Sequence, residues 1–161
     1  MLVVTIAGIE AAMRSLPEAW VISIWKPGCE PPSDPDNRRI LDLVFNDRIV
    51  PSADNQAATR ADARRILEFA ALAPIDQLII HCTVGESRSP AAAVGVAAIK
   101  SGIKYGQASD EQIALATEAP FVAATRACEL GCRFDVRLKP NEWLVALFDH
   151  ELGLNGRLLK A

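Results

Sequence analysis

The stretch that most limits the possible folds of this chain is LIIHCTVGESRSPAAAVGVAAIK, residues 78–100. Residues 76–82 are short and apolar on both faces, a pattern typical of a central strand that is covered on both sides. Residues 89–102 form an expected helix, with Pro90 just inside its start and Gly102 just past its end. That helix is apolar nearly all round, so it must also be buried. A buried strand leading into a buried helix predicts the centre of an α/β domain.

The rest of the chain supplies further strands and helices around this unit. Residues 2–8, 20–25 and 40–47 are short, apolar and β-branched, which predicts three more strands. A short helix is expected over 10–16. Residues 59–73 show helical spacing of apolar residues, with Thr59 as a possible cap. The proline-rich stretch 26–37 is expected to be a loop.

The last third of the chain is expected to be helical. The segments are 109–119, with Ser109 or Asp110 as cap, 121–130 and 141–153. Strand–helix alternation followed by helices predicts an α/β fold with a central, mostly parallel sheet flanked by helices and a helical C-terminal part. We expect one domain over residues 1–161, since this length suits a single core.

Composition and charge narrow the range of partners. Half of the residues are hydrophobic and the formal net charge is −3, which gives no electrostatic reason to expect nucleic acid or an anionic membrane surface as partner. No apolar run reaches the roughly 20 residues that cross a bilayer. The N-terminus lacks the basic region of a signal peptide, so we expect a cytoplasmic protein.

The four cysteines do not suggest a disulfide framework, because cytoplasmic thiols stay reduced. They are Cys29, Cys82, Cys128 and Cys132. Cys128 and Cys132 lie one helical turn apart, which is typical of two buried, inert thiols facing a core. A zinc site would need two further ligands, so we expect no metal. Whether either thiol acts as a redox partner of Cys82 stays open.

The loop after strand 76–82 carries the chemistry. A loop that feeds a helix N-terminus presents unpaired backbone N–H groups and the positive end of the helix dipole, which suits an anion. Gly85 allows close approach of a ligand, and Arg88 offers a planar fork of donors to two phosphate oxygens. The same field would stabilise a thiolate at Cys82 as nucleophile. Ser89 could cap the helix or hydrogen-bond the sulfur.

With His81 in front, HCTVGESRSP resembles the signature of the cysteine-dependent protein tyrosine and dual-specificity phosphatases: His-Cys, five residues, Arg and Ser or Thr. It is most similar to the dual-specificity branch, in small bacterial proteins of this type. The resemblance implies that fold and a cysteinyl-phosphate mechanism without cofactor. It implies Cys82 and Arg88 as catalytic residues. The phosphate-binding loop is then Thr83, Val84, Gly85, Glu86, Ser87 and Arg88.

The resemblance also implies a general acid on a loop after an earlier strand. Asp47 in VFND stands at the matching place, although an Asp after Asn is also common in turns. Asp54 is the alternative acid, and the choice stays open. His81 is expected to hydrogen-bond backbone near the loop and tune Cys82. Asn141 in the family-like KPNEW segment is expected to support the loop.

Two features leave the substrate open. No segment resembles the phosphotyrosine-recognition loop of the larger tyrosine-specific enzymes, so the pocket is expected to be shallow and to accept phosphotyrosine or phosphoserine and phosphothreonine on protein, or a small phosphomonoester. Glu86 would repel a polyanionic lipid headgroup. The alternatives are a rhodanese-like sulfurtransferase or arsenate reductase, and a non-catalytic phosphoprotein-binding module.

Overall fold

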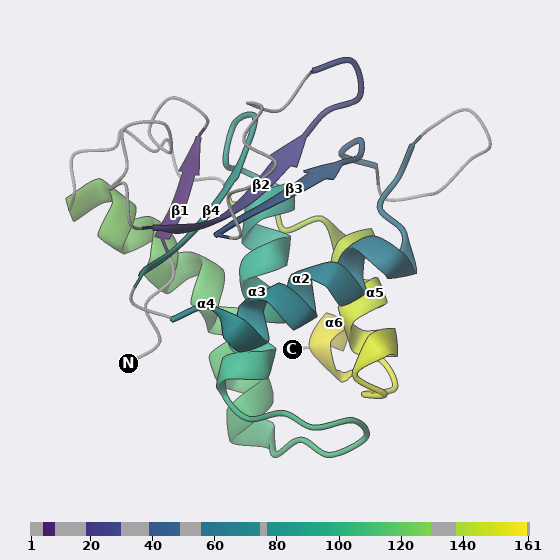
Figure 1. Ribbon diagram of the computed structural model, residues 1–161. Helices are drawn as coiled ribbons and strands as arrows, with labels where there is room; N and C mark the ends of the chain where they lie inside the picture. The colour runs from purple at the N-terminus through teal and green to yellow at the C-terminus, as the bar shows by residue number, and fades with distance from the viewer. Residues whose placement is uncertain are drawn as a thin grey trace.

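The described residues form an α/β fold in which a parallel sheet is flanked by helices (Figure 1). The computed structural model describes residues 5–8, 19–29, 39–48, 56–74, 77–129 and 138–160, and only the backbone of 5–8 and 120–129. The α/β prediction is confirmed at this level. The expected helix over 10–16 lies outside the described residues.

The sheet contains β1 (Thr5–Gly8), β2 (Trp20–Trp25), β3 (Ile40–Val44) and β4 (Leu78–Cys82). Its order is β1-β4-β2-β3, and every pairing is parallel. Strand β4 therefore has a neighbour on each side, which confirms its predicted central place. Because the strands are parallel, β2, β3 and β4 all end at the same edge of the sheet, and the segments that follow them meet there.

One face of the sheet supplies apolar rows to the core. Ile24 lies in register between Leu43 and Cys82, and all three side chains are buried. The row formed by Leu41, Ile22 and Ile80 repeats this pattern two residues earlier. These residues belong to the same buried cluster as the apolar faces of α2 (Arg60–Leu72) and α3 (Arg88–Lys100).

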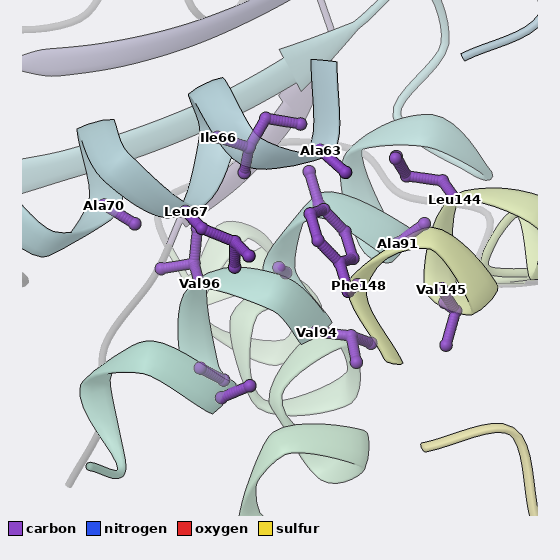
Figure 2. Close-up of a cluster of buried hydrophobic side chains, with 14 of the residues drawn as sticks. Ala63, Ile66, Leu67, Ala70, Ala91, Val94, Val96, Leu144, Val145 and Phe148 are labelled. Atoms are coloured by element: carbon purple, nitrogen blue, oxygen red, sulfur yellow. The ribbon is translucent and has the colours of Figure 1, made fainter. Parts of the chain in front are cut away.

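Helix α5 (Glu142–Glu151) completes this core. Figure 2 shows its Phe148 ring lying among side chains of α2 and α3, including Ala63 and Ala91. The ring fits because α3 has a glycine opposite it: a Cβ at Gly95 would lie 2.7 Å from Phe148 Cε1. A glycine in a helix interior is unfavourable by itself, so this close contact explains its presence.

The helix ends follow the predicted signals. Thr59 caps α2 in a capping box, its hydroxyl accepting from the Asp62 amide while the Asp62 carboxylate accepts from the Thr59 amide. After α3, Gly102 adopts a φ of +83°, the left-handed conformation that ends a helix. Ser109 forms a reciprocal pair of hydrogen bonds with Gln112 at the start of α4 (Asp110–Glu129).

The prediction of separate helices over 109–119 and 121–130 was wrong, because the single helix α4 covers both segments. Pro120 lies inside it. An interior proline removes one backbone hydrogen bond and costs about 3 kcal/mol. The helix continues because tertiary packing counters that cost: Ile113, Ala116 and Ala119 are buried in the core cluster. Within the described part of the chain, no helix is long and apolar enough to cross a membrane.

The predicted strand over 40–47 is shorter in the structure, because β3 ends at Val44. The chain leaves the sheet through Phe45, whose amide still donates to Trp25, and Asn46 then bridges to Ala57. Asp47 therefore lies on the segment beyond the strand. A short helix, α6 (Arg157–Lys160), closes the described chain, and Asp149 accepts hydrogen bonds from its Leu158 amide and from Gly156.

Candidate active site

Cys82 is the last residue of β4, and its side chain is only 2% exposed. The Cys82 Sγ accepts a hydrogen bond from the Gly85 amide at 3.2 Å and lies 3.3 Å from the Ser89 Oγ. Gly85 adopts a φ of +93°, which turns its N–H back toward the sulfur. Of the two roles considered for Ser89, the structure therefore shows contact with the sulfur.

The loop that follows Cys82 leads directly into α3. Ser87 occupies the N-cap position, but its side chain makes no cap hydrogen bond there, so the first amides of α3 lack a side-chain acceptor from it. The N-terminal end of a helix carries partial positive charge, which favours a bound anion or a thiolate. Thr83, Val84 and Glu86 are exposed, so the outer side of the loop faces solvent.

Arg88 begins α3 and is only 6% exposed. Its Nη1 donates to the Phe45 carbonyl at 2.9 Å, and its Nη2 donates to Thr83 Oγ1 at 2.9 Å. Its Nε is buried and has no hydrogen-bond partner among the described residues. None of the carboxylates described in the structure forms an ion pair with this guanidinium. A buried positive charge of this kind is expensive until an anion joins it.

Asp47 lies beside the Cys82 loop, although the two are far apart in sequence. Its Oδ1 accepts from Ser87 Oγ at 2.7 Å and from Asn141 Nδ2 at 2.7 Å. Asp47 is exposed to solvent. The structure thus brings Asp47 to the loop. The alternative acid, Asp54, lies outside the described residues.

Asn141 is buried, with 4% exposure, and caps α5 by accepting from the Leu144 amide at 2.9 Å. The backbone N–H of Asn141 donates to the Ser87 carbonyl at 3.1 Å, and the backbone N–H of Lys139 donates to the Glu86 carbonyl at 2.9 Å. The chain that enters α5 therefore holds the Cys82 loop as well as Asp47, which is a wider role than the expected support of the loop alone.

His81 precedes Cys82 in β4 with 5% exposure, and its ring lies at 89° to the Trp25 ring with a centroid distance of 5.7 Å. Burial lowers the pKa of His81, and the charge of Asp42 and a backbone hydrogen bond of Cys82 offset part of that effect. Its Nδ1 is buried without a partner in the described part of the chain. His81 is therefore a neutral, packed residue near neutral pH.

Phe45, whose carbonyl accepts from Arg88, was not anticipated at the site from the sequence. Thr83 and Ser87 were expected in the loop, but their side-chain contacts were not: the Thr83 hydroxyl accepts from Arg88, and the Ser87 hydroxyl donates to Asp47. Thr83 and Ser87 stand in the quoted loop, but nothing local in the pattern shows which way their hydroxyls turn. The side chain of Cys128 and the whole of Cys132 lie outside the described residues, so their predicted burial remains a prediction.

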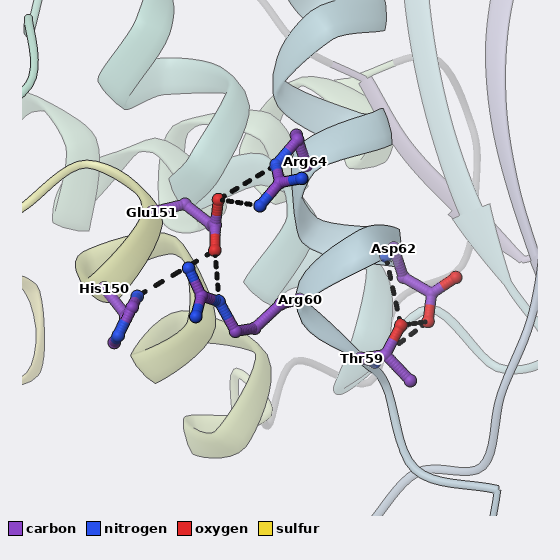
Figure 3. A network of polar contacts seen from close by, with 6 residues as sticks. All are labelled: Thr59, Arg60, Asp62, Arg64, His150 and Glu151. Atoms are coloured by element: carbon purple, nitrogen blue, oxygen red, sulfur yellow. Dashed lines mark hydrogen bonds and ion pairs between the residues drawn. The ribbon is translucent and has the colours of Figure 1, made fainter.

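A separate hollow of about 570 Å³ lies between the start of α2 and one side of α5. Its lining is Ala57, Ala58, Thr59, Arg60, Trp143, Ala146, Leu147 and His150. Two of these residues, Arg60 and His150, also belong to the polar cluster of Figure 3, in which Glu151 accepts hydrogen bonds from Arg60 and Arg64. The lining contains no thiol or carboxylate. The hollow therefore does not compete with the Cys82 loop as a catalytic site.

Comparison with models of known protein families and with curated proteins finds no match to this chain. Among the described residues, no group of three or more His, Cys, Asp or Glu side chains could hold a metal ion.

Proposed function

We propose that this protein is a cysteine-based phosphatase of the dual-specificity type, which hydrolyses phosphomonoesters through a cysteinyl-phosphate intermediate. The observation that carries the proposal is Arg88, a buried guanidinium with an unpartnered Nε, at the end of the loop that begins with Cys82. A phosphate group would supply the missing acceptor and the missing negative charge. The family-like fold and the single domain over 1–161 are parts of the same proposal.

In the first step, the Cys82 sulfur attacks phosphorus as a thiolate, and the ester oxygen leaves with the proton of Asp47. A sulfur–phosphorus bond forms as the phosphorus–oxygen bond breaks. The backbone N–H groups of the loop and Arg88 hold the equatorial oxygens, on which charge accumulates. No metal or cofactor is needed for this step.

In the second step, the Asp47 carboxylate removes a proton from water, and that water attacks phosphorus. The phosphorus–sulfur bond breaks, inorganic phosphate is released and Cys82 returns as a thiolate. The Ser89 hydroxyl, 3.3 Å from Sγ, donates a hydrogen bond to the departing sulfur. A free thiol of this kind works only under reducing conditions, so the proposal places the protein in the cytoplasm.

The exposed Thr83 and Val84 at the rim support a shallow site, which suits a phosphorylated side chain on a protein as well as a small phosphomonoester. Exposed Glu86 adds negative charge to the loop, and this disfavours polyanionic lipids. We propose phosphotyrosine as the first substrate class, with phosphoserine and phosphothreonine as the second.

Release of p-nitrophenol from p-nitrophenyl phosphate between pH 5 and 8 tests the proposal, with and without vanadate. We expect vanadate-sensitive turnover in the wild type and a loss of at least about 1000-fold in Cys82→Ser. Cys29→Ser, which changes the other described free thiol, is the control and should retain activity. Full activity of Cys82→Ser would contradict the proposal, and sulfur transfer from thiosulfate would favour a sulfurtransferase.

A further inference from the structure

We propose that Asn141 is a positioning residue for the general acid, and that it assigns the transferable proton of Asp47 to Oδ2. This inference rests on the proposed phosphatase function, because the place of the proton matters only if Asp47 acts on a leaving group. It adds a residue 94 positions away in the sequence to the residues that position the acid, and it names the oxygen that faces the substrate.

Both side-chain donors to Asp47 contact the same carboxylate oxygen, Oδ1. Asn141 Nδ2 and Ser87 Oγ each lie 2.7 Å from Asp47 Oδ1, and no residue that the structure describes donates to Oδ2. Two hydrogen bonds occupy the acceptor sites of Oδ1, so a proton on that carboxyl group belongs on Oδ2. Oδ2 is then the oxygen that gives the proton to a leaving group and later takes one from water.

The side-chain amide of Asn141 can take only one orientation. Its Oδ1 accepts from the Leu144 amide at 2.9 Å, so its Nδ2 must be the end that meets Asp47. Nδ2 also donates to the Arg48 carbonyl, with 3.2 Å between nitrogen and oxygen. An amide with all of these partners, buried at the N-terminus of α5, holds the segment around Asp47 before any substrate binds.

Other ionisable side chains lie on the segments that carry Asp47 and its two donors. These segments are 45–48, the loop 82–88 and residues 139–142 at the start of α5. Their ionisable side chains, besides Asp47, are Arg48, Cys82, Glu86, Arg88, Lys139 and Glu142. Among the contacts of the described residues, none of these side chains forms a hydrogen bond or an ion pair with Asp47. The orientation of the acid therefore depends on the two neutral donors, of which Asn141 belongs to a different part of the fold.

The test separates positioning from folding through the choice of variant. Asn141→Ser keeps a good N-cap for α5 but is too short to reach Asp47. Asn141→Asp also caps well, but it places a second carboxylate against Asp47. We expect Asn141→Ser to lower kcat on phenyl phosphate, a poor leaving group, by about 30- to 100-fold. On 2,4-dinitrophenyl phosphate, whose leaving group needs no proton, the loss should stay within about 3-fold.

The second variant gives a further readout that a merely structural role would not produce. Asn141→Asp keeps the cap, but its carboxylate cannot donate to Asp47, so it should show the same selective loss on phenyl phosphate. Thr59→Ala, which removes the cap of α2 away from Asp47, is the control for lowered stability and should affect both substrates equally.

The outcomes distinguish the two proposals. Selective loss on phenyl phosphate in both Asn141 variants supports the role of Asn141. Equal losses on both substrates overturn that role, while the phosphatase proposal stands. If the wild-type protein hydrolyses neither aryl phosphate, both proposals are overturned.

Discussion

The Arg88 guanidinium donates to the backbone carbonyl of Phe45 across 2.9 Å, although the two residues are 43 positions apart. Phe45 directly follows β3 and Arg88 begins α3, so this hydrogen bond joins the segment that carries Asp47 to the loop that begins at Cys82. Arg88 thus has a structural contact on Nη1 and an unused donor on Nε. The predictions below separate these contributions from one another.

The first prediction concerns anion binding by Arg88 without any catalysis. At a phosphate or vanadate concentration of about 100 times Kd, the wild type should gain about 2.7 kcal/mol in the free energy of unfolding. Arg88→Met should gain almost nothing, because the anion loses its guanidinium. Urea unfolding with and without the anion measures both. Arg64→Met removes an arginine that contacts Glu151 instead, so its gain should equal that of the wild type.

The second prediction concerns the Ser89 hydroxyl beside the Cys82 sulfur. Ser89→Ala should slow the release of the sulfur from the intermediate by about 100-fold and leave the first step much less affected. Stopped-flow measurement with p-nitrophenyl phosphate should then show a burst of one p-nitrophenol per protein before slow turnover. Ser101→Ala, at the other end of α3, should show wild-type kinetics. A burst-free loss of rate in Ser89→Ala would argue against this role.

The third prediction concerns the contact between Gly95 and Phe148. Gly95→Ala places a methyl group 2.7 Å from the Phe148 ring, so it should lower the free energy of unfolding by about 1 to 3 kcal/mol. Adding Phe148→Leu makes room for the methyl group. The double variant should therefore be less destabilised than the sum of the two single variants, by about 0.5 kcal/mol or more in urea unfolding. Additive losses would mean that the two positions do not touch.

The fourth prediction concerns His81, whose pKa burial lowers from the usual 6.5. The folded protein then binds fewer protons than the unfolded chain, so His81 should make the protein less stable as pH falls below 6.5, by at most about 1.4 kcal/mol per pH unit. The chain has two histidines, so NMR can assign both imidazoles. The His81 midpoint should lie below 6.5. A His81 midpoint above 6.5 would contradict the prediction.

Several parts of the molecule could be predicted from local patterns. The apolar run ending at Cys82 predicted a central strand, and β4 has a partner on each side. Thr59 and Gly102 marked the start and the end of their helices because capping depends on neighbouring residues. The loop from Cys82 to Arg88 could also be recognised, because a cysteine, a glycine and an arginine lie close together between an expected strand and an expected helix.

Other parts were decided only by the tertiary structure. Residues 109–119 and 121–130 were predicted to form two helices, yet packing of α4 in the core keeps one helix that includes Pro120. The sequence suggested Asp47 and Asn141 separately, but their contact spans 94 positions. It exists because parallel strands end at one edge of the sheet and α5 starts beside that edge. Local patterns determine which residues form a strand, loop or helix, whereas the direction of a side chain toward a distant partner depends on how those elements pack.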